Sequence, residues 1–503
     1  MPHTPRRRVL RPLLALGAIA GLAAAGLAAS VQPDRWWKPG EGRVMQESTD
    51  YPNAAGSLRV LLVDGPMDTR GHPFFEPLGE NGRACVTCHQ PSDAMSLSLD
   101  SIRRQWELRG HHDPLFAAFD GSNCPDLPQE RRESHSLLLD HGLIRIARPW
   151  PPRDHDGSPI ETDFEIEVVR DPTGCNLSDR WGLAAPEPMV SVYRRPRPVA
   201  NFKYILAMGF AVDPKRSQPL PIDPETGQMV SGNLMADRRV LSLEAQIRDA
   251  LQTHLEFKGR LSPEDIARIT DFEQRVYAAQ QTSRVGGDLD TGGATGGPAT
   301  LRDSPAGRLG SQGVPVWSEF NAWADAGKDA SLTPGQRAWR ESVARGAQNF
   351  RERMFLISDT TGINSPMGFG NPVLDRCAFC HNMSQMGMDV APGQVDLGTT
   401  TRPFADPQPH LPLFRITCTG EPHPHYGRVI ETHDPGFALT TGRCADVGKI
   451  TLQSLRGLAA RAPYFSNGSA KTLREVIEYY DRRYNIGYSE QEIQDLVHLM
   501  EAL

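Results

Sequence analysis

Two five-residue motifs, CVTCH at positions 85–89 and CAFCH at positions 377–381, each combine two cysteines with a histidine. Thiols one helical turn apart reach the two vinyl groups of a haem, and the histidine that follows reaches the iron as an axial ligand. Zinc and dithiol sites, the other uses of C-x-x-C, do not need the histidine. The motifs therefore predict two covalently bound haem c groups. The attachment residues and iron ligands are Cys85, Cys88, His89, Cys377, Cys380 and His381.

The remaining four of the eight cysteines form a second set. An even number of cysteines in a chain sent to an oxidising compartment favours disulfides. Pairing each cysteine with its nearest neighbour keeps both bridges within one expected domain. We therefore expect Cys124 bound to Cys175 and Cys418 bound to Cys444, with free buried thiols as the alternative.

Residues 1–30 have the pattern of a secretory signal peptide. Arginines come first, an apolar stretch from Leu13 to Leu27 follows, and small residues end the segment. This pattern predicts export to the periplasm. An uncleaved signal anchor is the alternative, and only then is a membrane expected as a partner.

The length and composition indicate more than one globular unit. A chain of 503 residues is too long for one ordinary core. Its formal net charge of −7 argues against nucleic acid as a partner. The expected divisions are a signal peptide at 1–30, a tether at 31–57, an N-terminal haem domain at 58–284, a glycine-rich linker or loop at 285–314 and a C-terminal haem domain at 315–503.

Helical patterns dominate the expected secondary structure. We predict helices at Ser262–Gln281, where Ser262 and Asp265 resemble a capping box, and in the segment 333–355. Two further helices are expected at Thr472–Arg483 and Ser489–Ala502. Short β-like stretches appear only between Leu143 and Val169. The expected fold is thus mostly α, with two cytochrome c-like haem domains, long loops and little β structure.

The segment Ser454–Tyr484, SLRGLAARAPYFSNGSAKTLREVIEYYDRRY, resembles the corresponding segment of the bacterial di-haem cytochrome c peroxidase/MauG superfamily. Its SLR, APYF-x-x-G and TL-x-E-V elements stand in the same order. Together with the two haem motifs, the resemblance covers most of the chain and looks closest to the MauG-like and BthA-like branches. It implies a periplasmic di-haem oxidoreductase that reacts with hydrogen peroxide through high-valent haem iron. The His89 haem would be peroxidatic and the His381 haem would transfer electrons from a small cytochrome c, a cupredoxin or a protein substrate.

A second family pattern implies the catalytic residues. The segment DRRVLSLEAQ matches it at Asp237, Arg239, Leu243 and Gln246, and Glu256 falls at the place of a distal glutamate. Glu256 would move a proton between the two peroxide oxygens, and Gln246 would orient the peroxide. On one unbroken helix these two residues would lie about 80° apart in azimuth and about 15 Å apart along the axis. A break near 250–254 is therefore required, and His254 is the alternative proton carrier.

Tyr480 occupies the position at which family peroxidases carry an axial methionine and MauG-like proteins carry tyrosine. The resemblance therefore implies Tyr480 as a ligand of the second iron. Periodicity places Tyr480 on one buried helix face, and Tyr479 beside it points aside. A buried core tyrosine is the alternative. The predicted face consists of Leu473, Val476, Ile477, Tyr480 and Tyr484.

The chain departs from the family at two places. Ala236 replaces the tryptophan that is thought to bridge the haems. Leu452 and Gln453 replace the usual Thr-Pro before SLR at the interdomain calcium site, so one Ca²⁺ would have to bind backbone carbonyls. No family motif marks His111 or His112. These residues either lie in a surface loop or reach the first haem as a closing ligand in a resting state.

Two other functions fit the motifs. A plain di-haem electron carrier needs two six-coordinate irons and no distal acid. A di-haem oxygenase, like the rubber-cleaving enzymes of the same superfamily, would bind oxygen without added peroxide.

Overall fold

The computed structural model describes Met1 and most of the chain from Arg35 onward. The signal peptide expected at 1–30 lies outside the described residues, apart from Met1. Among the residues covered, no helix has both the length and the apolar character that crossing a membrane requires. The described ranges after Met1 are 35–154, 156–207, 211–212, 219–220, 222–306, 314–364, 369–388 and 394–503.

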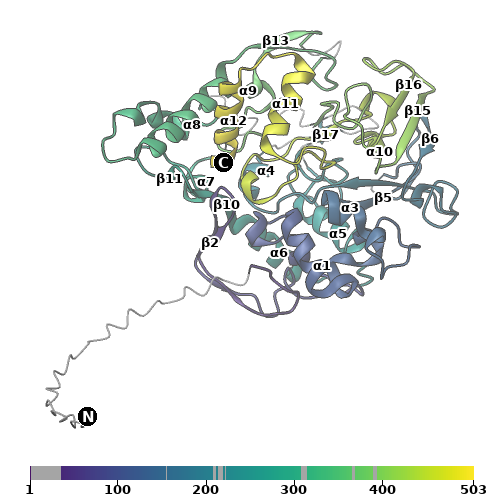
Figure 1. The fold of residues 1–503 in the computed structure, drawn as a ribbon. Helices are drawn as coiled ribbons and strands as arrows, with labels where there is room; N and C mark the ends of the chain where they lie inside the picture. Colours follow the sequence, from purple (N-terminus) through teal and green to yellow (C-terminus); the bar gives the residue numbers. More distant parts are fainter. Residues whose placement is uncertain are drawn as a thin grey trace. The chain divides into compact units, whose positions relative to one another are not determined.

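The helices form two sets along the chain. The earlier helices are α1 (Leu99–Arg109), α2 (Ala118–Gly121), α3 (Ser136–His141), α4 (Phe202–Ile205), α5 (Leu243–Thr253) and α6 (Pro263–Arg275). The later helices are α7 (Pro298–Asp303), α8 (Pro334–Glu352), α9 (Cys377–Cys380), α10 (Ala438–Thr441), α11 (Leu473–Tyr484) and α12 (Glu490–Ala502). Figure 1 shows α8, α9, α11 and α12 of the later set close together.

Local sequence explains where the longer helices begin. The side chain of Ser262 accepts a hydrogen bond from the backbone N–H of Asp265 and caps α6. Thr333 caps α8 in the same way, Thr472 caps α11 and Ser489 caps α12. The predicted helix starts are confirmed at all four positions.

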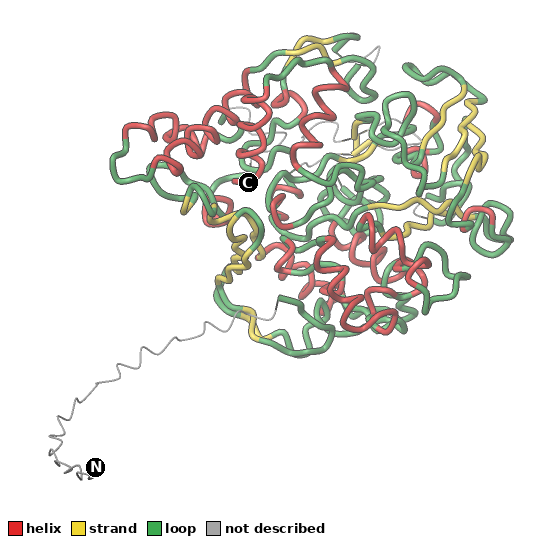
Figure 2. The backbone as a smooth tube through the Cα atoms, in the orientation of Figure 1, coloured by secondary structure: helices red, strands yellow, loops and turns green. Residues whose placement is uncertain are grey.

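The expectation of a mostly α fold with little β structure is wrong. About 33% of the described chain is helical and 18% lies in strands, which form several small sheets (Figure 2). The strands are β1 (Val44–Met45), β2 (Ser48–Pro52), β3 (Gly56–Leu62), β4 (Met67–Asp68), β5 (Ile144–Pro149), β6 (Phe164–Arg170), β7 (Met189–Arg194), β8 (Ala211–Val212), β9 (Pro219–Leu220), β10 (Val276–Ser283), β11 (Gly287–Asp288), β12 (Phe355–Ile357), β13 (Val373–Asp375), β14 (Gln394–Val395), β15 (Leu413–Cys418), β16 (Val429–Thr432) and β17 (Ile450–Thr451).

The clearest error concerns the end of the helix expected at Ser262–Gln281. Helix α6 ends at Arg275 and the chain continues directly as strand β10, which pairs antiparallel with β3 from Val276 opposite Leu62 onward. Alanine and glutamine in VYAAQQ suit a helix, so the local pattern gave no sign of the change. A partner more than 200 residues away in sequence decides the conformation instead.

Strands also join the segments that were expected to form separate units. Strand β6 pairs with β15 in the sheet of order β16-β15-β6, with Ile166 opposite Ile416. Within the expected tether at 31–57, β2 pairs with β3 and Tyr51 is buried. Within the expected linker at 285–314, β11 extends the same sheet as β10. Residues 35–503 cluster as one unit.

Both expected disulfides are present in the structure. Cys124 is bonded to Cys175 and Cys418 to Cys444, with Cα–Cα distances of 5.2 and 5.7 Å. The four cysteines of the two C-x-x-C-H motifs are not in disulfides. They therefore remain available for thioether bonds.

Candidate functional site

A cavity lies against the first motif, and Cys85, Cys88 and His89 line it. Helices α5 and α6 supply one wall, and the loop after β7 supplies another. Residues that are far apart in the sequence thus enclose the side chains that the motif provides.

The His89 imidazole is held by the loop that follows it. Its Nδ1 lies 3.2 Å from the carbonyl oxygen of Met95, six residues later, and Met95 adopts a left-handed φ of +57°. Burial lowers the pKa of His89 to about 4, so the ring is neutral. A ring whose Nδ1–H donates to a carbonyl has its Nε2 lone pair free for a metal.

The second motif repeats this arrangement. The Nδ1 of His381 lies 2.7 Å from the carbonyl oxygen of Gly387, again six residues later, and burial lowers the pKa of the ring. Gly387 has φ +58°, and a Cβ added there would overlap the Trp317 indole. The shared geometry fits haem c with His89 and His381 as axial ligands.

Several residues that line the first cavity have buried polar atoms without a hydrogen-bond partner among the described residues. Gln246 on α5 has its Oε1 buried and unbonded, and the same holds for both amide atoms of Asn233 and for Oε2 of Glu273 on α6. Burial raises the pKa of Glu273 to about 8, which keeps its carboxyl protonated at neutral pH. Buried polar groups normally have partners, so these atoms indicate a polar occupant.

Glu256 lies close to the first cavity without lining it. Helix α5 ends at Thr253, within the region where a break was required, and Glu256 adopts a left-handed φ of +52°. Its Oε2 accepts a hydrogen bond from Nδ2 of Asn81 at 3.1 Å. The residues that line the cavity include Gln246 and His254 and do not include Glu256.

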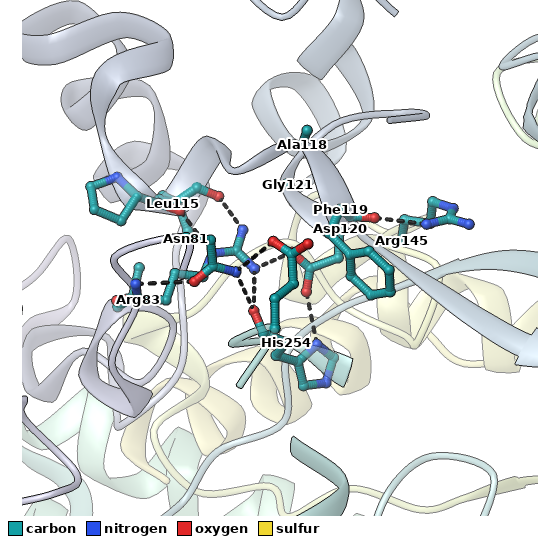
Figure 3. A network of polar contacts seen from close by, with 12 residues as sticks. Asn81, Arg83, Leu115, Ala118, Phe119, Asp120, Gly121, Arg145 and His254 are labelled. Carbon is teal, nitrogen blue, oxygen red and sulfur yellow. Dashed lines mark hydrogen bonds and ion pairs between the residues drawn. The ribbon is translucent and has the colours of Figure 1, made fainter. Parts of the chain in front are cut away.

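A buried polar network holds His254 at the cavity wall (Figure 3). Its Nδ1 lies 2.8 Å from Oδ2 of Asp120 on α2, and the other oxygen of Asp120 pairs with Arg83. Arg83 also donates to the His254 carbonyl at 3.1 Å and to the Leu115 carbonyl at 2.7 Å. The network fixes Nδ1 and leaves Nε2 as the reactive nitrogen.

No sequence pattern pointed to Arg83 or Asp120. Arg83 precedes the first motif by only two residues, whereas Asp120 and His254 are 134 residues apart. No spacing rule connects such residues, because the folded chain alone brings them together.

The charge of Arg83 keeps the pKa of Asp120 below its ordinary value despite burial, so Asp120 is a carboxylate.

A second cavity lies against the second motif. The predicted face of α11 is confirmed, since all five of its residues line this cavity. Tyr480 is among them, and its hydroxyl has no hydrogen bond in the part of the chain that the structure describes. Tyr479 lies outside the cavity, where its hydroxyl donates to the Leu397 carbonyl at 2.9 Å. Burial raises the pKa of Tyr480 well above its ordinary value.

The two cavities share a short stretch of wall, since Arg195 and Pro196 line both. Ala236 lines the first cavity, and its carbonyl accepts from the N–H of Thr451, which lines the second. No aromatic residue among those described lines both. His111 stacks on His112 with ring centroids 4.0 Å apart, and neither residue lines the first cavity.

Comparisons with known proteins identify relatives for part of the chain. No family model matches it. Cytochrome-c peroxidase IdrP1 of Denitromonas iodatirespirans is 36% identical over 144 residues, which is 25% of this chain and 36% of that protein. IdrP1 of a Pseudomonas species is 33% identical over 146 residues, with the same 25% and 36% shares. The chain therefore matches little more than a third of the length of these relatives. The matches confirm the resemblance to the bacterial di-haem cytochrome c peroxidase superfamily.

One solved structure aligns over most of the chain. It is a variant of the diheme peroxidase BthA from Burkholderia thailandensis, with 14% identity, 91% of this chain and 95% of that chain covered, and a TM-score of 0.29. A TM-score this low does not show that the two chains share a fold.

Proposed function

We propose that the protein is a di-haem oxidoreductase of the cytochrome c peroxidase type, which reduces hydrogen peroxide in the first cavity. One observation carries the proposal. Each cavity holds a C-x-x-C-H histidine with Nδ1 bonded to a backbone carbonyl, and among the described lining residues only the first cavity adds a carboxyl group, Glu273, and a second histidine, His254. Two cofactor sites that differ in their acid–base groups suit one site that reacts and one that relays electrons.

Haem iron, when bound, would take oxidising equivalents from peroxide and hold them in high-valent form. The overall reaction converts one hydrogen peroxide, two electrons and two protons into two waters. The protein must therefore orient the peroxide and move its proton from one oxygen to the other.

His254 is the residue whose position best suits the proton step. Its Nε2 is the free nitrogen at the cavity wall, and Asp120 holds the opposite nitrogen at 2.8 Å. Asp120 is a positioning residue, which would also stabilise the imidazolium after proton uptake. Gln246 can donate or accept a hydrogen bond with the peroxide. Glu256, the acid implied by the family pattern, would need to leave Asn81 in order to act.

Tyr480 is the proposed sixth ligand of the second iron. It lines the same cavity as His381, and its hydroxyl has no partner within the described residues. An oxygen ligand stabilises oxidised iron more than a thioether does. Tyr480 would in this way favour the oxidised state of a haem bound in the second cavity.

We propose the periplasm as the location, supported by the leader pattern and by the two disulfides. The electron donor would be a small cytochrome c, a cupredoxin or a side chain of a protein substrate.

The test is steady-state oxidation of a reduced small cytochrome by the purified di-haem protein, with and without peroxide. We expect two cytochromes to be oxidised for each peroxide consumed. An electron carrier would consume no peroxide. Substrate oxidation driven by oxygen alone would favour the oxygenase and contradict the proposal.

A further inference from the structure

Three arginines meet where the two cavities approach each other. Arg195 lines both cavities, Arg197 lines the first and Arg461 lines the second. Arg195 and Arg461 are each only 6% exposed. Arg195 also donates to the carbonyl of Arg461 at 3.0 Å, which fixes two of the three side by side.

These guanidiniums carry charge that the described chain does not neutralise. None of the three forms an ion pair with a carboxylate within the described ranges, whereas the adjacent Arg194 pairs with both Asp237 and Asp434. Burial, and to a smaller extent the charge of Arg461, lower the pKa of Arg195 to about 9. Burial also lowers the pKa of Arg197 and of Arg461 to about 10. Such burial is costly unless an anion compensates it.

The same arginines occupy the place where a calcium ion was expected. Arg197 donates to the carbonyl oxygens of Thr451 and Leu452 at 3.0 and 3.2 Å. Arg461 donates to the Ser454 carbonyl and to Oε1 of Gln453. Ca²⁺ needs six to eight oxygen ligands, which are often carboxylates. Here the carbonyl oxygens already accept hydrogen bonds from guanidinium groups, and the nearby charge is positive. The residues at this place therefore do not suit Ca²⁺.

We propose that Arg195, Arg197 and Arg461 form an internal cationic site that replaces the expected calcium ion and binds carboxylates of the two cofactors. The ligands are the propionate side chains of haem, which guanidinium groups bind in bidentate geometry. The carboxylate part rests on the proposed function, since it requires haem in both cavities. Arg195, which borders both cavities, would bind a propionate from either haem and link the two sites.

The metal part is tested on the purified holoprotein by elemental analysis. We expect far less than one calcium per chain, and neither EGTA nor added Ca²⁺ should change the absorption spectrum or the melting temperature. One tightly bound calcium per chain, or loss of the haem spectrum in EGTA, would overturn the replacement. These measurements use no peroxide, so they are independent of whether the protein is a peroxidase.

The carboxylate part is tested by redox titration of single variants. Removing a cation beside a propionate stabilises ferric haem, so Arg197→Gln should lower the potential of the first haem and Arg461→Gln that of the second. Arg195→Gln should lower both. Arg302→Gln removes an exposed arginine that pairs with Asp303 and serves as the control, with neither potential changed.

Unchanged potentials in all three variants with full haem content would overturn the carboxylate assignment. If a variant does not fold, the conservative lysine substitution at the same position keeps the charge and should retain the wild-type potential. A wild-type protein without haem would instead refute the proposed function.

Discussion

The two cavities share one attachment geometry and differ in what the rest of the chain brings to them. In each, the histidine of the motif bonds through Nδ1 to a carbonyl six residues later. The first cavity is lined by Glu273 and His254 and by no described tyrosine. Among its described lining residues, the second cavity has no carboxylate and no histidine besides His381, but it has Tyr464, Tyr480, Tyr484 and Tyr488.

This difference teaches that the motif determines which cofactor binds and that distant residues determine what the cofactor does. His254 and Asp120 offer an acid–base pair to the first cavity. The α11 face offers the second cavity aliphatic side chains and two phenols, Tyr480 and Tyr484, and the Tyr484 hydroxyl is already bonded to Thr360 at 2.8 Å. On the proposed function, protons would be handled at the first site and oxidising equivalents would be stabilised at the second.

The largest expected effect comes from removing one attachment site. Replacing Cys377 and Cys380 together by alanine should reduce the mass of the protein by one haem and leave the first cavity loaded. The reciprocal variant at Cys85 and Cys88 should lose the other haem and with it the reaction with peroxide. Mass spectrometry of the intact protein measures both, and two haems retained in either variant would contradict the assignment.

The proton step separates two neighbouring residues of the first cavity. His254→Gln should slow the reaction with peroxide by a factor of about 10² while the haem spectrum stays nearly intact. Glu256→Gln, the change that the family pattern singles out, is the matched comparison. If His254→Gln leaves the rate of the reaction with peroxide unchanged and Glu256→Gln reduces it about 10²-fold, Glu256 transfers the proton instead.

Replacing the Tyr480 phenol should change the properties of the second haem only. Tyr480→Met should raise its reduction potential, because a thioether stabilises ferric iron less than a phenolate does. Tyr479→Phe is the control, since Tyr479 does not line the cavity and its hydroxyl donates to the Leu397 backbone carbonyl. If Tyr480→Met leaves the potential and the spectrum unchanged, Tyr480 serves only packing.

The smallest expected effect concerns the pH dependence of stability. The pKa of Glu273 is raised to about 8 by burial, above its unfolded value of 4.5. The favourable contribution of Glu273 to the free energy of unfolding is therefore fully present below pH 4.5 and is lost as the pH rises toward 8. Glu273→Gln removes this loss, so the variant should melt about 2–5 °C higher than the wild type at pH 8, with a smaller difference at pH 5. Equal melting differences at both pH values would show that Glu273 does not titrate in this range.

The sequence predicted those features that depend on local spacing. The motifs, the disulfide pairs, four helix starts and the cavity-lining face of α11 all follow from residues close together in the chain. Strand β10 was missed because its residues suit a helix and its partner β3 lies far away in sequence. Asp120 was missed for the same reason, since only the folded chain places it beside His254.

The central claim, that the first cavity reacts and the second relays, is tested most directly by rapid mixing of the ferric protein with one equivalent of hydrogen peroxide. Absorption and electron paramagnetic resonance spectra should show the first haem with an open sixth position, and the peroxide should be consumed as that signal disappears. His254→Gln should delay the change at least about tenfold. Two six-coordinate haems whose spectra do not respond to peroxide would contradict the account and leave an electron carrier.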